Sequence, residues 1–169
     1  MKLIKANKKH KDIVLEFKEK IIEAGERFCG VSGLERLDFD EWLERNKSIE
    51  NKSTCPEGIV PAFQYIYVDD ESKVIGMINL RLELNDFLLK FGGHIGYSIV
   101  PDERRKGYAK AMLKEGLKFY KNHDYEKVLI TCDINNIASA KTIEACGGEL
   151  ENIIKEDELH STKRYWIKL

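Results

Sequence analysis

One strand–helix–strand unit constrains the fold of this chain more than any other feature. Residues 91–100, FGGHIGYSIV, have the pattern of a strand that is entered through two glycines and stops at Pro101. Residues 127–134, KVLITCDI, form a nearly continuous apolar run, which is typical of a strand buried on both faces. Between them, apolar side chains recur at helical spacing from Arg105 to about Lys121. Because strands joined by a crossover helix lie parallel in one sheet, the unit predicts an α/β chain.

The remaining segments add helices before this unit and strands on either side of it. Helices are predicted over residues 7–25, about 38–49 and 136–146. Further strands are predicted over residues 1–6, 63–68, 73–84, 148–156 and 161–169. The order β-α-α-β-β-β-α-β-α-β-β predicts a mixed sheet flanked by helices. Because no linker-like segment interrupts it, we expect a single domain over residues 1–169.

Charge and cysteine content exclude several classes of function. The chain has 28 basic and 29 acidic residues and a net charge of -1, which argues against the broad basic surface of a nucleic-acid-binding protein. The four cysteines lack zinc-site spacing, so we expect no metal. The start of the chain has no apolar leader and no apolar run is long enough for a membrane span, which predicts a cytoplasmic protein that does not bind membranes.

A basic turn enters the helix of the crossover unit. Arg104, Arg105 and Lys106 precede Gly107, and the helix begins beside them. The first N–H groups of a helix lack intrahelical partners, and the helix dipole favours an anion there. Gly107 leaves room for a phosphate to approach the backbone. These features predict a pyrophosphate site, although solvated surface charge and a nucleic-acid patch are the competing interpretations.

Two sequence stretches resemble the GCN5-related N-acetyltransferase (GNAT) family. Residues 104–109, RRKGYA, fit the family signature Q/R-x-x-G-x-G/A, and the preceding strand ends in an apolar pair and Pro101. Residues 133–148, DINNIASAKTIEACGG, are similar to the strand end and small-residue helix that follow in that family. The likeness extends over nearly the whole chain, and residues 92–113 further resemble a bacterial branch of predicted acetyltransferases.

This resemblance implies a GNAT-type fold, with a mostly antiparallel mixed sheet that splays between its fourth and fifth strands. It also implies acetyl-CoA as cosubstrate, with the pantetheine arm in the splay and the pyrophosphate at the basic turn. Asn136 is also open to interpretation as a simple helix cap. The cofactor-binding residues implied in this way are Ile99, Val100, Arg104, Arg105, Lys106, Gly107, Tyr108, Ala109, Asn136 and Ser139.

The chemistry implied by the resemblance is direct attack of a primary amine on the thioester in a ternary complex. A backbone N–H in a bulged GYSIV strand is expected to stabilise the thioester oxygen. Glu83 is the first candidate for the base, His94 the second, and a water relay the third. Many family members place a Tyr acid where this chain has Ile143, so Tyr97, Cys146 and solvent remain open as the acid.

The acceptor is not identified by the sequence. The family resemblance implies that the first two helices and the loop after them shape its pocket, and both charge signs occur there. A small polar amine, an antibiotic and a peptide or protein amine all remain open, and the family resemblance allows a homodimer. A non-catalytic acyl-CoA sensor is the alternative function, favoured mainly by Ile143 in the acid position.

Overall fold

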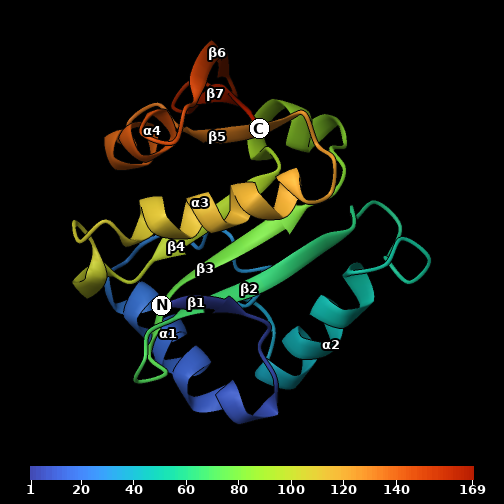
Figure 1. Ribbon diagram of the computed structural model, residues 1–169, viewed down its shortest axis with the longest axis vertical. Helices are drawn as coiled ribbons and strands as arrows, with labels where there is room; N and C mark the ends of the chain where they lie inside the picture. Colours follow the sequence, from blue (N-terminus) through green and yellow to red (C-terminus); the bar gives the residue numbers. More distant parts are fainter.

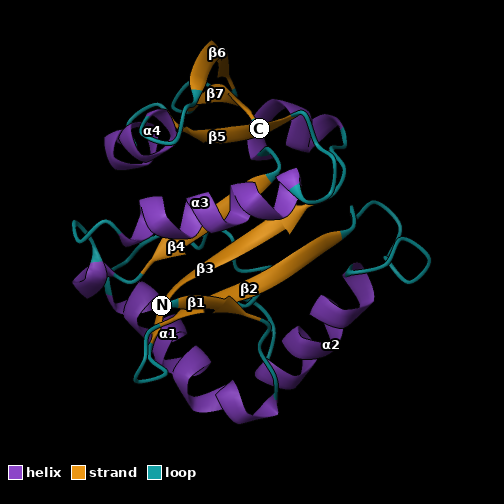
Figure 2. Cartoon of the chain, viewed as in Figure 1, coloured by secondary structure: helices purple, strands orange, loops and turns teal.

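The computed structural model describes residues 1–169, and its centre is one seven-stranded sheet (Figures 1 and 2). The strands lie in the spatial order β1-β2-β3-β4-β5-β7-β6. All neighbouring strands are antiparallel except β4 and β5, which are parallel. The predicted mixed, mostly antiparallel sheet is therefore confirmed. The strands are β1 (Lys2–Ile4), β2 (Ala62–Val68), β3 (Val74–Arg81), β4 (Ile95–Ile99), β5 (Lys127–Asp133), β6 (Glu149–Lys155) and β7 (Ser161–Lys168).

Helices cover both faces of the sheet. In Figure 1, α1 and α2 lie on one side of the sheet, and α3 crosses the other side. Three short helical turns complete the chain. The α-helices are α1 (Lys11–Glu23), α2 (Phe39–Ile49), α3 (Tyr108–Lys121) and α4 (Ile137–Glu144). The short turns are η1 (Lys8–His10), the π-helical η2 (Leu88–Gly92) and η3 (Pro101–Glu103).

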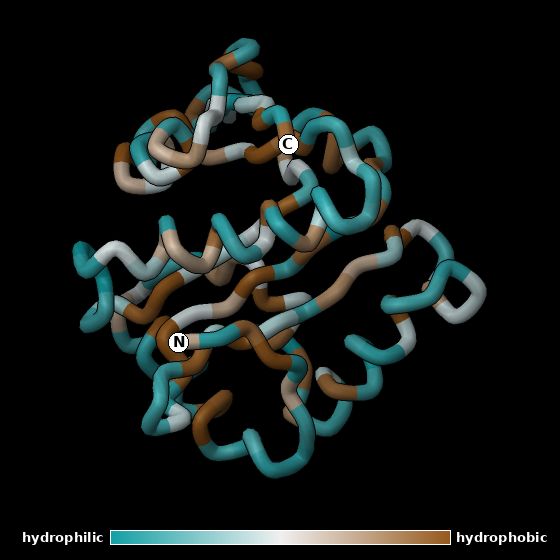
Figure 3. Tube along the Cα trace, viewed as in Figure 1, coloured by the Kyte–Doolittle hydropathy of each residue, from teal (hydrophilic) through white to brown (hydrophobic).

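Each face of the sheet has its own hydrophobic core. One cluster joins α3 and α4 to β3, β4, β5 and β7, with Leu113, Tyr120 and Ile143 among its fully buried members. The other joins α1 and α2 to β2 and β3, with Phe17 and Trp42 at its centre. Figure 3 shows the hydrophobic residues gathered along the central strands and the hydrophilic ones along the outer turns. The sheet is therefore an inner layer between two layers of helices.

Local sequence signals explain the helices that frame the sheet. The Asp38 carboxylate accepts a hydrogen bond from the Glu41 N–H at 2.8 Å, and Glu41 accepts one from the Asp38 N–H at 3.2 Å. This capping box starts α2 where the sequence predicts. In α1, Val14, Phe17 and Ile21 are buried at helical spacing, so one face packs on the sheet.

Several predicted boundaries differ from the structure. The strand predicted over residues 73–84 stops at Arg81 because the chain bends at residues 82–83, and the Leu82 N–H makes the last ladder bond, to the Pro61 carbonyl at 2.7 Å. The strand predicted from residue 91 begins only at Ile95, because residues 91 and 92 belong to η2. Helix α3 begins at Tyr108 and not at Arg105, whose φ of 61° lies in the left-handed region.

The predicted bulge in the GYSIV strand is wrong. Residues of β4 pair with β3 in unbroken register, from Leu80 opposite Ile95 to Gly76 opposite Ile99. A bulge places two residues opposite one, and no such step occurs in this pair. No helix in the structure combines the length and apolar character needed to cross a bilayer.

A close approach of two glycines fixes the loop between α1 and α2 against β4. A Cβ on Gly30 would lie 2.2 Å from the Gly96 carbonyl oxygen, and Gly30 has a φ of +69°. Beside this contact, the Ser98 hydroxyl donates to the Cys29 carbonyl at 2.8 Å. The loop therefore rests directly on the backbone of β4.

We expect Gly30→Ala to lower the free energy of unfolding by about 2–4 kcal/mol, because it combines left-handed strain with steric overlap. Gly25→Ala is the matched control, since Gly25 has a φ of +65° and no atom within 4 Å of an added Cβ. The control should lose only about 1 kcal/mol in urea denaturation. Equal losses of unfolding free energy in the two variants would show that the close Gly30–Gly96 contact does not contribute to stability.

Candidate active site

The parallel strands β4 and β5 meet at one end and separate at the other. Their only paired residues are Ile95 and Ile130. Just before this pair, the His94 N–H donates to the Leu129 carbonyl at 2.7 Å. Beyond it, β5 has no residue paired with the rest of β4. The sheet therefore contains a wedge-shaped opening, closed at Ile95 and widening toward Ile99.

The backbone of β4 presents alternate peptide groups to this opening. Bonds such as Val100 N–H to Ile75 O at 3.0 Å show that the even-numbered residues bond to β3. The peptide groups of Tyr97 and Ile99 consequently face the β5 side. The Ile99 carbonyl accepts from Arg104 Nε at 3.0 Å. The structure does not support the expectation that the Val100 backbone faces the cofactor, because the Val100 N–H donates to the Ile75 carbonyl of β3.

The wide end of the opening leads to the N-terminus of α3. Gly107 is the N-cap, with a φ of 85°, and no side chain caps the helix. The first N–H groups, from Tyr108 to Lys110, thus have no intrahelical acceptor. An added Cβ at Gly107 would meet nothing within 4 Å. The turn has the open backbone donors and free space that a pyrophosphate group requires.

The three basic residues of the turn have different surroundings. Arg104 donates through both Nη atoms to the Glu26 carboxylate at 2.5 Å. Lys106 pairs with Glu103 at 2.8 Å. Hydrogen bonds from Lys106 and then Lys73 lower the pKa of Glu103 to about 2. Arg105 forms no ion pair and is exposed. Of the three, Arg105 is the one whose charge is free for a ligand.

Helix α4 lies across the opening from β4. The Asn136 side chain caps this helix, because its Oδ1 accepts from the Ser139 N–H at 3.0 Å. The contacts of Asn136 are therefore those of a helix cap. Ser139 Oγ lies 2.9 Å from the Tyr97 hydroxyl, which links α4 to β4. Burial raises the pKa of Tyr97 to about 12, so the phenol stays protonated near neutral pH.

The other side-chain candidate for the acid, Cys146, is less suitably placed. Ile143, at the position where many family members have a Tyr acid, is fully buried in the core of the α3 face. Cys146 follows α4, and its Sγ lies 3.9 Å from the Lys110 carbonyl in the first turn of α3. Burial raises the pKa of the Cys146 thiol, so the thiol form is favoured. Among the side chains expected to supply a proton, only Tyr97 lies on the strand that lines the opening.

His94 closes the narrow end of the opening and does not suit the role of a base. Its Nδ1 accepts the Leu129 N–H at 2.9 Å, and the rings of Tyr120 and Tyr125 contact it edge-on. Burial lowers its pKa from 6.5 to about 4, so the imidazole is neutral near pH 7. The histidine therefore has a structural role and holds β4 against β5.

Glu83 is also not positioned as a base. It follows β3 and forms an ion pair with Lys52 at 2.6 Å on the protein surface. The expectation of a carboxylate on the strand beside β4 fails because β3 ends at Arg81, two residues earlier. The chain is already turning away from the sheet at this point.

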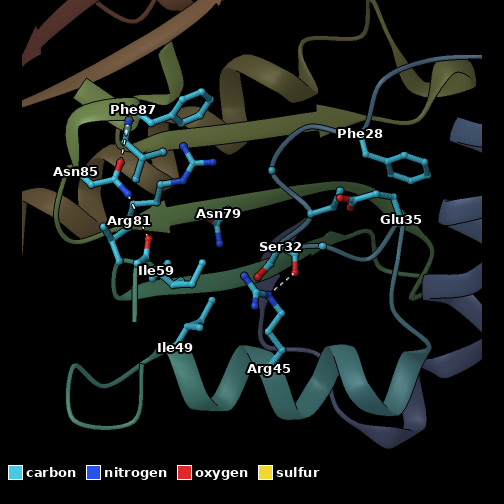
Figure 4. A pocket seen from close by; sticks show the side chains of 17 residues that line it. Phe28, Ser32, Glu35, Arg45, Ile49, Ile59, Asn79, Arg81, Asn85 and Phe87 are labelled. Atoms are coloured by element: carbon cyan, nitrogen blue, oxygen red, sulfur yellow. Dashed lines mark hydrogen bonds between the residues drawn. The ribbon is translucent and has the colours of Figure 1, made fainter. Parts of the chain in front are cut away.

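A cavity of about 500 Å³ (Figure 4) lies on the face of the sheet that α1 and α2 cover, opposite the face covered by α3 (Figure 1). Its walls come from the loop after α1, the end of α2, residues 58–62, the end of β3 and residues 85–88. Asn79 and Arg81 contribute from β3. In register, Asn79 lies opposite Gly96 of β4. No residue of β4 lines the cavity, but two residues of its lining, Gly30 and Arg81, lie against Gly96 of β4, next to Ile95 at the closed end of the opening.

The cavity lies where the family resemblance predicts an acceptor pocket, but the sequence patterns did not indicate its charged residues. Arg45 on α2 and Arg81 on β3 extend toward it from different elements (Figure 4). The one available signal was compositional, since Asn79 and Arg81 interrupt a strand that is otherwise apolar. The contribution of Arg45 depends on where α2 packs, which its own sequence does not indicate.

The family comparison agrees with this geometry. The family model described as "Acetyltransferase (GNAT) domain" matches residues 23–149, more than half of the chain. The chain belongs to the GNAT acetyltransferase family. It is an acyltransferase on this evidence, and the family and fold predicted from the sequence are confirmed.

Solved structures of other GNAT proteins share the fold. A spermidine N-acetyltransferase from Vibrio cholerae in complex with CoA and spermine has a TM-score of 0.68 and 18% identity, covering 99% of this chain and 94% of that one. A dodecameric structure of the Vibrio cholerae enzyme has the same TM-score and identity, with 99% and 92% covered. A putative phosphinothricin N-acetyltransferase has a TM-score of 0.62 and 17% identity, with 99% and 98% covered. None of the curated proteins matches the chain.

The surroundings of His94 predict a pH dependence of stability. Its pKa is lower in the folded protein than in the unfolded chain, so protonation favours unfolding. Stability from this group is complete above pH 6.5 and is lost as the pH falls toward about 4. Between pH 7 and 5, we expect the wild type to lose about 2 kcal/mol more unfolding free energy than His94→Gln.

Urea denaturation at the two pH values measures this difference. Glutamine can accept the Leu129 N–H through its amide oxygen but does not titrate. The surface carboxylates contribute equally to both proteins, so the comparison isolates the imidazole. Parallel loss of stability in the two proteins would contradict a neutral, buried His94.

Proposed function

We propose that this GNAT protein transfers the acetyl group of acetyl-CoA to a primary amine by direct attack in a ternary complex. The main supporting observation is that β4 lies between an opening and a cavity. The opening between β4 and β5 leads to the α3 N-terminus, and the cavity lies on the α1 and α2 face, where its lining residues Gly30 and Arg81 separate it from Gly96 of β4. Two ligands can therefore approach one strand without competing for the same space, which supplies proximity.

The residues around the opening fit the parts of acetyl-CoA. The peptide group of Tyr97 and the N–H of Ile99, which face the β5 side, can pair with the pantetheine amides as a neighbouring strand would. The free N–H groups at Tyr108 and Ala109, with the Arg105 charge, suit the pyrophosphate. When bound, acetyl-CoA supplies an activated acyl group, and the chain supplies position and hydrogen bonds.

The acceptor amine is proposed to occupy the cavity. A protonated amine with a pKa near ~10.4 must lose its proton before it can attack. Neither Glu83 nor His94 lines the cavity, so we propose that water in the cavity carries this proton away. On the other side of the thioester, the protonated Tyr97 hydroxyl is proposed to donate to the departing thiolate.

Residues 1–169 are proposed to act as one catalytic domain, because strands from both ends of the chain join the same sheet. All four cysteines are free thiols, which suits the reducing cytoplasm as the proposed location. The expected homodimer stays a prediction.

CoA should raise the melting temperature of the protein, and Gly107→Glu should abolish the shift. At a CoA concentration of 100 Kd, binding stabilises the folded state by about 2.7 kcal/mol, or roughly 5–10 °C for a chain of this size. A glutamate at Gly107 would fill the open space and repel the pyrophosphate. Differential scanning fluorimetry with and without CoA measures the shift.

Gly25→Glu controls for the added charge and the left-handed strain, because Gly25 also has a positive φ and open space around it. This variant should keep the full CoA shift. A Gly107→Glu protein that is still stabilised by CoA would count against a pyrophosphate site at this turn.

Tyr97→Phe should reduce kcat by about 10-fold while the CoA shift is retained. The effect is modest for a general acid because a thiolate with a conjugate pKa near ~8.5 already leaves readily. Ser139→Ala is the matched variant, since it removes the partner of the hydroxyl and keeps the phenol. Thiol release from acetyl-CoA measures both rates, and an unchanged kcat in Tyr97→Phe would exclude it as the acid.

A further inference from the structure

The cavity beside β4 contains two guanidinium groups that lack carboxylate partners. Arg36, Arg104 and Arg164 form ion pairs with glutamates, whereas Arg45 and Arg81 form none. Arg45 Nε donates to the Ser32 carbonyl at 3.2 Å. Arg81 Nη1 donates to the Gly92 and Gly93 carbonyls at 2.8 and 2.9 Å. The other N–H groups of both side chains have no acceptor within the protein.

No carboxylate of the cavity lining pairs with the positive charges of Arg45 and Arg81. Its one carboxylate, Glu35, lies 3.2 Å from Arg36 Nε. Burial lowers the pKa of Arg81, which reflects the cost of holding this cation away from water. Buried charges in proteins are normally paired, so an anionic ligand group would complete the site.

The rest of the lining is largely apolar. Phe28, Ile49, Ile59 and Phe87 contribute to the walls (Figure 4). Asn79, on the floor, already donates to Gln64 at 3.2 Å. The cavity therefore offers an apolar surface with a positively charged region, and its volume of about 500 Å³ suits a small molecule.

We propose that the acceptor is a small amine that also carries a carboxylate, with hydrophobic α-amino acids as the best fit. This inference rests on the proposed acetyl transfer and specifies its substrate class. Arg45 and Arg81 bind the carboxylate, and the aromatic and aliphatic walls contact the side chain. A polyamine would instead place several positive charges beside two guanidinium groups, which is electrostatically unfavourable.

The location of Arg81 explains why the amine should be in the α position. Arg81 lies two residues along β3 from Asn79, which faces Gly96 of β4. In an α-amino acid, a single carbon separates the carboxylate from the amine. A carboxylate held at Arg81 therefore keeps its amine beside β4, where the opening closes.

The test compares phenylalanine, phenethylamine, phenylalaninamide and spermidine as acceptors, with thiol release from acetyl-CoA as the readout. Phenethylamine lacks the carboxylate, and phenylalaninamide keeps its size without the charge. We expect kcat/KM for phenylalanine to exceed that of each of the other three amines by about 10- to 100-fold, as hydrogen bonds to a charged group provide.

Arg45→Gln should raise KM for phenylalanine by a similar factor with little change in kcat, and should leave phenethylamine nearly unaffected. Lys47→Gln is the control, since Lys47 lies on the same helix, pairs with Glu44 and does not line this cavity. If Arg45→Gln loses the preference for phenylalanine over phenethylamine, Arg45 recognises the carboxylate. If the residue only holds the loop at Ser32 in place, the variant would reduce the rates with both substrates alike.

Three results would overturn the inference. These are higher kcat/KM for spermidine or phenethylamine than for phenylalanine, equal losses for both substrates in Arg45→Gln, or no thiol release with any amine. If CoA still shifts the melting temperature and an uncharged or cationic amine is acetylated, only the substrate class is wrong. If CoA has no effect and no thiol is released, the proposed acetyl transfer fails as well.

Discussion

The hydrogen bond between the His94 imidazole and the Leu129 N–H marks the point at which β4 and β5 stop pairing and the sheet opens. The imidazole accepts the Leu129 N–H, a bond that a backbone carbonyl of β4 would accept in an ordinary parallel ladder. The buried amide is thereby satisfied, and β4 and β5 are held together at one level without being committed to pair further on. The Tyr120 hydroxyl, 2.9 and 3.0 Å from the carbonyls of Arg81 and His94, joins β3 to the same point. A sheet that is fixed here and open beyond can admit an extended ligand.

Alternation along β4 allows the two faces of this strand to serve different purposes. Ile95, Tyr97 and Ile99 contact the core under α3. The residues between them face α1 and α2, and Gly96 is small enough for the loop at Gly30 to reach the backbone. The proposed cofactor site and acceptor cavity therefore lie on different sides of β4, with Gly30 and Arg81 between the cavity and Gly96.

Features set by nearby residues could be predicted from the sequence, and features set by distant residues could not. The capping box at Asp38, the hairpin between β2 and β3 and the glycine at the start of α3 follow from residues a few positions apart. The ion pair between Arg104 and Glu26 joins residues 78 positions apart, and it leaves Arg105 as the free charge of the turn. Arg45 and Arg81 become neighbours of one cavity only after α2 packs beneath the sheet. Charge patterns in a sequence thus identify where a site lies better than they identify which charges remain available.

The loop between α1 and α2 contacts both the turn before α3, where the cofactor is proposed to bind, and the cavity proposed for the acceptor, although it has little regular secondary structure. Its backbone carbonyls accept from Trp42 at 2.7 Å, from Gln64 at 2.9 Å and from Ser98 at 2.8 Å, so α2, β2 and β4 each hold it in place. At its start, Glu26 binds Arg104 in the turn before α3. Because these bonds are made largely to backbone atoms, the path of the loop is fixed even where its side chains are exposed. The same segment therefore supports the turn at the cofactor side and forms a wall of the cavity. A substitution in this loop would change the position of the proposed cofactor site relative to the acceptor cavity without altering the residues proposed to contact either ligand.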